Sequence, residues 1–325
     1  MTLHALGIDI AKETYQVVLL RDDKKRSHTF RNHPDTFAEL TAWLAKHHVA
    51  QVHACMEATG RYWEDLAVFL FQAGHLVSVV NPARIHGYAK SKLSRNKTDK
   101  LDAALIADFC ATQNPPLWTP PPPEVHELQA MARHLEALHQ MRTQEGNRLA
   151  SGVPSDQVLQ MLREHVAFID DQIDALKQRI QDHINQHPGL KQQQDLLTTI
   201  PGIGDLTAAK LLGENIQSFS STRSLAAYAG LSPQKGESGT SVHRRSKLCK
   251  VGNGSLRKAL YFPAICAMRF NPLIMDFCDR LAHRDKHTMV IIGAAMRKLL
   301  CLALGVLKSG VPFDPYHVEN VQLAA

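Results

Sequence analysis

The sequence predicts an α/β domain at the N-terminus, a coiled-coil helical insert and a mainly α-helical C-terminal domain. The first 113 residues alternate short apolar segments of two-residue period with segments of helical period. A proline-rich stretch at 114–123 interrupts this pattern, as an extended linker does. Long segments with apolar residues every three or four positions follow, which is the spacing of paired helices. We therefore predict domains at 1–113 and 191–325, joined through the linker at 114–123 and coiled-coil helices at 124–190.

The composition is that of a globular protein with room for two domains. The 325 residues are 44% hydrophobic and 21% charged, so each domain can bury its own core. Six cysteines without CxxC spacing indicate reduced thiols, mostly in the core. We find no signal peptide and no apolar run long enough to span a bilayer, so we expect a cytoplasmic protein without a membrane partner. The net charge of +6 and the pI near 9.0 favour a polyanionic partner.

The N-terminal domain has a recognisable order of predicted elements. Three strands joined by tight turns are followed by a helix, a strand, a helix, an apolar strand and two further helices. The predicted ranges are 3–12, 15–20, 28–30, 35–47, 52–56, 63–73, 76–80, 83–90 and 99–112. This order is that of the ribonuclease H fold, which we predict for this domain; the family resemblance given below implies that it is RuvC-like.

Four acidic residues share one place in that predicted fold. Asp9 lies on the first strand, Glu57 at the end of the fourth, and Asp99 and Asp102 on one face of a helix. In a ribonuclease H fold these positions converge at one edge of the sheet, where carboxylates repel unless cations neutralise them. Oxygen ligands favour Mg²⁺, with Mn²⁺ as an alternative. Two such ions about 3.5–4 Å apart can activate an attacking oxygen and stabilise a leaving one in phosphodiester chemistry.

Each acidic residue also has a simpler explanation. Asp9 could be a surface residue at a strand end, and Glu57 could cap the turn before the next helix. Asp99 could be a helix N-cap and Asp102 could form a surface ion pair. The shared position of all four leads us to favour the metal site.

Actin-like sugar kinases form a rival fold, because they also begin with a Gly-Ile-Asp strand. They need a glycine-rich turn after the aspartate to hold phosphates, whereas the segment 10–14 has no glycine. The kinase interpretation is therefore disfavoured.

Beyond the linker, the apolar pattern predicts a coiled coil. The a/d positions, spaced alternately by three and four residues, are Leu159, Leu162, Val166, Ile169, Ile173, Leu176, Ile180 and Ile184. A break at 151–155 separates this helix from an earlier one. The two helices could form a hairpin within the chain or a dimer between chains, and the pattern fits both.

The C-terminal domain carries two features that suit a nucleic acid. In Ile200-Pro-Gly-Ile-Gly204, a helical hairpin, the backbone at Gly202 and Gly204 can contact a phosphate, or the segment can be an ordinary tight turn. From Gly239 to Met275 no residue is acidic. The cations that we predict to contact phosphate there are Arg244, Arg245, Lys247, Lys250, Arg257 and Lys258. A plain solvated surface is the alternative.

The preceding segment, 228–241, is glycine-rich and shows no regular period, while the apolar pattern at 290–307 predicts a packing helix.

Taken together, these motifs resemble those of the insertion sequence 110 family of bacterial transposases, which are Piv-type recombinases. The resemblance runs nearly end to end. It rests on Gly7-Ile-Asp9, Glu57-Ala-Thr-Gly60, Asn96-Lys-Thr-Asp-Lys-Leu-Asp102, Ile200-Pro-Gly-Ile-Gly204, Ala229-Gly-Leu-Ser-Pro233, Glu237-Ser-Gly239 and Ser255-Leu-Arg-Lys-Ala-Leu260. By motif, the resemblance implies a DEDD set of Asp9, Glu57, Asp99 and Asp102 together with a nucleophilic serine at Ser238.

The resemblance also implies an activity and its partners. It implies recombination of donor and target DNA through a covalent phosphoserine, guided by a bridge RNA, in homodimers that assemble into tetramers in the bacterial cytoplasm near the nucleoid. Glycines at 236 and 239 would let a phosphodiester approach Ser238, but Thr240 and Ser241 are equally plausible hydroxyls. Only the Glu-Ser-Gly match selects Ser238. A junction resolvase that uses water as nucleophile, or a non-catalytic nucleic-acid-binding protein, remain the alternatives.

Overall fold

The computed structural model describes residues 4–21, 24–92, 98–152, 155–238 and 242–316, and from 235 to 247 only the backbone path is considered. The chain forms two compact units, Met1–Pro120 and Pro121–Ala325, which we describe separately. All six cysteines are free; Cys55, Cys110 and Cys278 are buried, whereas Cys266 is exposed.

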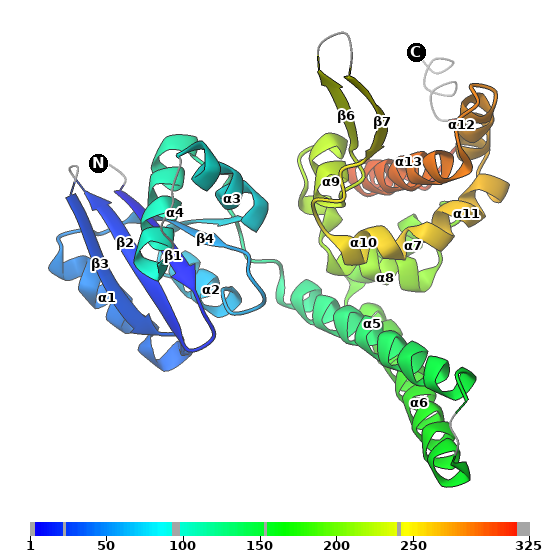
Figure 1. Ribbon diagram of the computed structural model, residues 1–325, viewed down its shortest axis with the longest axis horizontal. Coiled ribbons are helices and arrows are strands. Elements are labelled where there is room, and N and C mark those ends of the chain that lie inside the picture. The colour runs from blue at the N-terminus through cyan, green and yellow to red at the C-terminus, as the bar shows by residue number, and fades with distance from the viewer. Residues whose placement is uncertain (1–3, 22–23, 93–97, 153–154, 239–241, 317–325) are drawn as a thin grey trace. The chain divides into compact units, whose positions relative to one another are not determined.

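The first unit is built on a mixed five-stranded sheet of order β3-β2-β1-β4-β5 (Figure 1). The strands are β1 (His4–Ile10), β2 (Thr14–Arg21), β3 (Lys24–Arg31), β4 (Val52–Glu57) and β5 (Leu76–Val80). The first three strands form an antiparallel meander, and β1 pairs in parallel with β4. The predicted α/β class and the predicted sequence of strands and helices are confirmed.

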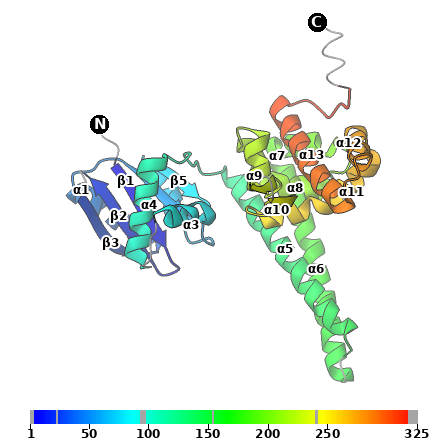
Figure 2. The ribbon, with the colours of Figure 1, turned by 45° about the horizontal axis from the view of Figure 1, so that its top comes forward.

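Helices cover both faces of this sheet. The 3₁₀ turn η1 (Pro34–Thr36), α1 (Phe37–Lys46) and α2 (Glu64–Gln72) are followed by α3 (Pro82–Ser91) and α4 (Asp99–Gln113). One face, with Leu6 and Ile8 of β1, packs against apolar side chains of α1 and α2. The other face, with Ala5 and Cys55, packs against α3 and α4. Both views show α4 lying across β1 and β2 (Figures 1 and 2).

The proline-rich stretch does not leave the sheet at once. The backbone N–H of Trp118 donates to the Val77 carbonyl of β5 at 2.7 Å. The buried hydroxyl of Ser78 lies 2.8 Å from the Pro116 carbonyl, and the Trp118 ring packs edge-on against Trp63. The prolines have no N–H to donate, so along β5 a backbone bond from Trp118 is supplemented by the Ser78 hydroxyl, which donates to proline carbonyls. Much of the stretch at 114–123 therefore packs along β5 and belongs to the first unit.

The second unit begins with two long helices, α5 (Pro123–Ala150) and α6 (Asp156–Gln186). They pack against each other as a hairpin, with Leu138 buried against Ile169 and Ile173 (Figure 2). The Arg142 guanidinium pairs with the Asp170 carboxylate at 3.1 Å across the hairpin. The heptad pattern allowed a hairpin within the chain or a dimer between chains, and the structure shows the hairpin. Its contacts use a/d positions that the sequence predicted, such as Ile169 and Ile173.

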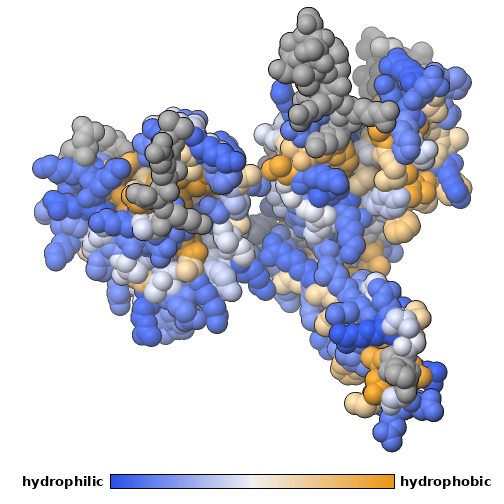
Figure 3. Space-filling model, in the orientation of Figure 1, coloured by the Kyte–Doolittle hydropathy of each residue, from blue (hydrophilic) through white to orange (hydrophobic). Residues whose placement is uncertain are grey.

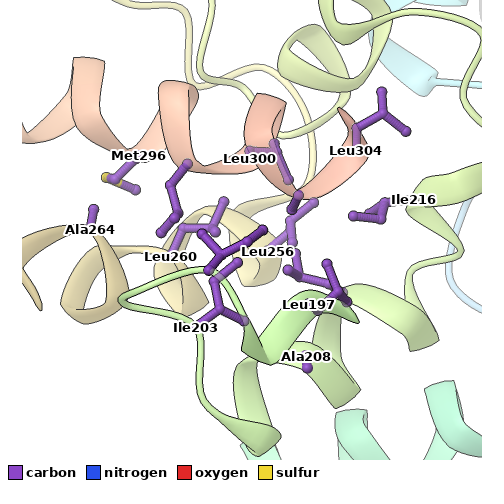
Figure 4. Packing of buried hydrophobic residues seen from close by; sticks show 14 of the residues in the cluster. Leu197, Ile203, Ala208, Ile216, Leu256, Leu260, Ala264, Met296, Leu300 and Leu304 are labelled. Atoms are coloured by element: carbon purple, nitrogen blue, oxygen red, sulfur yellow. The ribbon is translucent and has the colours of Figure 1, made fainter. Parts of the chain in front are cut away.

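The remaining helices enclose one large core. They are α7 (Pro188–Thr198), α8 (Asp205–Gly213), η2 (Ile216–Ser218), α9 (Thr222–Tyr228), α10 (Gly254–Ala259), α11 (Tyr261–Phe270), α12 (Pro272–Ala282) and α13 (Thr288–Ser309). Figure 4 shows Leu256 of α10, and Leu260 between α10 and α11, turned toward Leu300 of α13. The predicted packing helix at 290–307 is thus the core of this unit.

Two sequence expectations about this unit were wrong. The statement that no apolar run could span a bilayer fails for α13, which is long and apolar enough by composition. Burial of 61% of its apolar window inside the unit identifies it as a core helix.

The glycine-rich segment was expected to be irregular, yet β6 (Pro233–Ser238) and β7 (Val242–Leu248) form an antiparallel hairpin. The charges of both strands and the glycine of β6 hid the two-residue apolar period that identifies a strand.

Candidate functional site: an acidic sheet edge and a serine hairpin

The sheet register places Asp9 and Glu57 side by side. In the parallel pair of β1 and β4, Gly7 is level with Cys55 and Ile8 with Met56, so the next position sets Asp9 level with Glu57. Adjacent strands lie about 4.8 Å apart. Because side chains alternate along a strand, Asp9 shares the α4-facing side with Gly7, and Glu57 shares it with Cys55.

Helix α4 brings the other two carboxylates to the same edge. Its later residues, including Ile106 and Cys110, pack with Ala5 near the start of β1, whereas Ala103 and Ala107 pack at Gly7. The helix therefore runs antiparallel to β1, and its first turn, which carries Asp99 and Asp102, points toward the Asp9 end.

A glycine makes this approach possible. A Cβ at position 7 would lie 2.1 Å from the Ala103 carbonyl oxygen and 2.2 Å from the Ala107 nitrogen. The backbones of α4 and β1 are thus in direct contact, closer than any larger residue allows. Gly7 therefore positions the acidic first turn of α4 over the end of β1.

The surroundings of the four carboxylates differ. Asp9, Glu57 and Asp102 are half-buried, and Asp99 is exposed. The Thr59 hydroxyl donates to Glu57 Oε1 at 2.9 Å, in the turn after β4. The explanation of Asp99 as a helix cap is wrong, because the Thr98 side chain is the N-cap and accepts from the Leu101 N–H.

The four carboxylates do not form a complete metal-binding site among the described residues. Within the ranges that the structure describes, no three histidine, cysteine, aspartate or glutamate side chains are grouped closely enough to hold a metal ion. The donor set nevertheless suits Mg²⁺ or Mn²⁺, since all four side chains at this edge are carboxylates and hard divalent ions prefer oxygen. The backbone brings the four residues to one edge, and side-chain rotation would decide how many contact one ion.

Ser238 lies at the tip end of the two-stranded hairpin. It is the last residue of β6, and its backbone pairs with Val242 of β7. The alternative hydroxyls Thr240 and Ser241 lie outside the described residues. Arg244, Arg245 and Lys247 all lie on β7, so the structure places the predicted serine and half of the predicted cations on one hairpin.

The other predicted cations divide into two kinds. Arg257 is half-buried and its Nη1 donates to the carbonyls of Ala229, at 3.2 Å, and Lys250, at 3.4 Å. A Cβ at Gly230 would lie 2.4 Å from that same nitrogen. Arg257 therefore ties two loops together and is committed to the protein. Lys250 and Lys258 are exposed.

The helical hairpin between α7 and α8 uses its two glycines differently. Gly202, at φ +107°, packs on α11, where a Cβ would lie 2.7 Å from the Ala267 Cβ. Its role is the tight turn, as the alternative interpretation held. Gly204 is exposed at the N-cap of α8, with open space around its Cα. Only Gly204 is open to a phosphate.

Sequence reasoning missed a largely buried polar cluster formed by residues of α5, α8 and α10. Lys210 Nζ lies 3.1 Å from Glu214 Oε1 and 3.8 Å from Glu136 Oε2, and the Ser255 hydroxyl donates to Glu136. The Glu214 carboxylate also accepts from Tyr228, whose pKa is raised by burial and by that carboxylate. The i,i+4 spacing of Lys210 and Glu214 was a readable signal. Glu136 and Ser255, 119 residues apart, gave none.

Comparison with known proteins adds the family. A transposase profile of the insertion sequence 110 type, named for its DEDD motif, matches residues 6–155, and the profile "Transposase IS116/IS110/IS902 family" matches residues 194–279. The chain is 39% identical over 315 residues to a pilin gene-inverting protein of Moraxella bovis, covering 95% of this chain and 97% of that one. A Moraxella lacunata protein of the same name matches equally. The transposase for insertion sequence element IS1328 of Yersinia enterocolitica is 24% identical, over 95% of this chain and 98% of its own.

An acidic sheet edge joined in one chain to a helical, cation-rich unit, with transposase matches to both, defines a DNA-recombining enzyme of the transposase class. The chain belongs to the insertion sequence 110 family of transposases.

Proposed function

We propose that this transposase cuts and rejoins DNA with a divalent cation at the acidic edge and Ser238 as the nucleophile. The proposal rests chiefly on the register that sets Asp9 level with Glu57, together with the packing of α4 at Gly7. In this proposal the domain at 1–113 is RuvC-like, of the ribonuclease H fold, with the strand order 3-2-1-4-5 as support. The domain at 191–325 supplies the serine, and the helices at 124–190 connect the two.

The proposed ligands are the carboxylates of Asp9, Glu57, Asp99 and Asp102. Bound Mg²⁺ would supply charge neutralisation for the phosphodiester and its leaving oxygen. The carboxylates hold and orient that charge, and they can accept the proton that the serine loses. Glu57 keeps its orientation through the hydrogen bond from Thr59.

The reaction of Ser238 would conserve the phosphodiester bond. Its Oγ attacks phosphorus and forms a phosphoserine, its proton passes to a carboxylate or solvent, and a sugar hydroxyl leaves with a proton. A hydroxyl from the other DNA strand then attacks the phosphoserine, which restores Ser238 and seals the new junction. This two-step exchange needs no external energy source, because each broken bond is replaced by an equivalent one.

The proposed partners follow from the family. We infer that donor and target DNA bind along the cations of β7 and the exposed Lys258 of α10, and that a bridge RNA selects the sites. Homodimers assembling into tetramers would bring two DNA strands together, in the cytoplasm near the nucleoid and without a membrane. The 39% identical relatives are named for inverting a pilin gene, so inversion of a DNA segment is the reaction to test beside transposition.

Covalent capture of DNA is the decisive experiment. Purified protein would be incubated with donor and target DNA, Mg²⁺ and the RNA that co-purifies with it, then denatured and separated by electrophoresis. We expect a protein–DNA adduct that mass spectrometry locates on Ser238, and we expect Ser238→Ala to lose the adduct but keep DNA binding.

The alternatives give different results in this assay. Cleavage without an adduct would identify a nuclease or junction resolvase that uses water. Salt-sensitive binding without cleavage would identify a non-catalytic nucleic-acid-binding protein. An adduct on Thr240 or Ser241 would keep the reaction class and contradict the assignment of Ser238. Full transposition by protein freed of RNA would contradict guidance by RNA.

A further inference from the structure

The second unit contains a large cavity that the proposed catalytic residues do not use. It measures about 880 Å³ and lies between α5, α8, α10 and α11. Most of its lining is apolar, with Leu135, Leu206 and Met296 among the contributing side chains. Cavities of this size hold small ligands or single nucleotides.

Polar groups are gathered in its lining. Lys210 is 8% exposed, and its ammonium lies between the Glu214 and Glu136 carboxylates. The Ser255 hydroxyl donates to Glu136, whose side chain is 25% exposed. Glu214 is saturated by Lys210, Tyr228 and Asn253, so Glu136, Lys210 and Ser255 are the groups of this cluster that line the cavity. Glu136 offers an acceptor oxygen and Lys210 an ammonium donor, whereas the Ser255 hydroxyl spends its proton on Glu136 and orients that carboxylate.

The rim carries an exposed aromatic ring beside a cation. Phe262 is 76% exposed although phenylalanine is normally buried, and exposed Lys258 lines the same cavity four residues earlier. Both lie in the span 239–275, which contains no acidic residue. Figure 3 shows hydrophobic patches among hydrophilic surface on the helical unit. A ring for stacking and a nearby cation for phosphate are the components of a single-strand binding site.

We propose that this cavity receives one unstacked nucleotide of the DNA or RNA on which the transposase acts. The inference rests on the proposed function, which supplies the nucleic acid. Phe262 stacks on the base, Lys258 contacts its phosphate, and the base edge meets Glu136, Lys210 and Ser255 inside.

The polar lining favours particular bases. A carboxylate accepts from an amino or imino N–H of a base, and an ammonium donates to its carbonyl oxygen. Guanine and cytosine present an amino donor and a carbonyl acceptor on one edge. Thymine and uracil present an imino N–H beside a carbonyl, whereas adenine lacks the carbonyl. We therefore expect the cavity to favour guanine, cytosine, thymine or uracil over adenine.

The test compares two exposed aromatic residues of the same helix. Phe262→Ala removes the ring at the cavity, and Phe270→Ala is the matched control, 66% exposed and outside the cavity lining. Binding of single-base DNA and RNA oligonucleotides, and of a duplex of equal length, would be measured by fluorescence anisotropy over a salt series. Circular dichroism would check that both variants fold.

The expected result is specific to single strands. Phe262→Ala should bind single strands of guanine, cytosine, thymine or uracil about tenfold more weakly, with an unchanged salt slope and unchanged duplex binding. Phe270→Ala should bind as the wild type does, and Glu136→Gln should reduce the preference for these bases.

Four outcomes would overturn the proposal. One is equal single-strand binding by both phenylalanine variants and the wild type. Another is a concentration-dependent dimer that Phe262→Ala abolishes, because a second copy of the chain would then be the occupant. A third is a wild type that cleaves duplex DNA but binds no single strands, which would leave the proposed function intact. A wild type that neither binds nor cleaves nucleic acid would reject both.

Discussion

The acidic edge and the serine hairpin are supported in opposite ways. Asp9 and Glu57 lie on neighbouring strands of a five-stranded sheet that is covered by helices on both faces. Ser238 lies at the end of a two-stranded hairpin, which by itself is only marginally stable. The hairpin is held at its base by Leu248, which packs against the core and approaches Gly293 of α13.

The difference fits the two proposed chemical roles. A metal site needs carboxylates held in fixed positions, and a buried sheet register holds neighbouring strands in one alignment. A nucleophile that joins and releases DNA strands must reach different phosphates in turn. Under the proposed function, the first unit would therefore supply orientation and the hairpin reach, and the following changes test this comparison.

Removing charge from the acidic edge should have the largest effect. Asp9→Asn and Asp102→Asn each remove a proposed metal ligand with little change in volume, so strand cleavage should fall below detection while the fold persists. Asp108→Asn is the matched control, because Asp108 lies on the same helix but pairs with Lys92 at 3.0 Å. Gel assays with EDTA and added Mg²⁺ would measure this. Full activity of both edge variants would contradict the metal site.

The contact between α4 and β1 should come next. Gly7→Ala would force the helix off the strand, since the new Cβ would lie 2.1 Å from the Ala103 oxygen. We expect about 1–3 kcal/mol lower unfolding free energy, as in overpacked cores, together with lost cleavage. Gly87→Ala, in α3 with open space around it, should instead be neutral or slightly stabilising. Urea unfolding would distinguish them, and equal behaviour would mean that α4 packs elsewhere.

The two neighbouring cations of α10 should separate folding from binding. Arg257→Gln removes hydrogen bonds to two loop carbonyls and should lower stability by about 1–3 kcal/mol. Lys258→Gln should leave stability unchanged and reduce the log–log salt slope of nucleic-acid binding by about one.

Replacement of Arg244, Arg245 and Lys247 with Ala should reduce that slope by about one per lost phosphate contact. An unchanged slope would place these cations in solvent.

The smallest expected effect is a pH dependence in the first unit. His75 is 5% exposed, neither ring nitrogen has a hydrogen-bond partner among the described residues, and burial lowers its pKa. Below the ordinary histidine pKa of 6.5, the unfolded chain binds a proton at this position that the folded chain does not. The free energy of unfolding therefore decreases as the pH is lowered. The slope is at most about 1.4 kcal/mol per pH unit. In His75→Leu, the free energy of unfolding should depend less on pH between about pH 5 and 7, the window set by an ordinary histidine pKa. Urea unfolding at each pH would measure this. An unaltered slope would assign the effect to other histidines.

The sequence by itself determined the α/β class, the succession of strands and helices, the heptad seam and the family, whereas the structure showed that the seam pairs within the chain. Apolar period is a local property and survives in one dimension, which is why the strand at 76–80 and the helix at 290–307 were predicted nearly to their ends. Asp9 and Glu57 could be assigned to one edge because parallel neighbouring strands end together.

Only the tertiary structure decided which polar residues are committed to the protein. Arg257 and Lys258 are adjacent and equally basic, yet one ties two loops together and the other is exposed. Gly202 and Gly204 differ in the same way, since α11 covers only the first. The cluster of Glu136, Lys210 and Ser255, and the cavity that it lines, join residues as far as 119 positions apart. Such pairings depend on how the helices pack, and no periodicity along the chain records them.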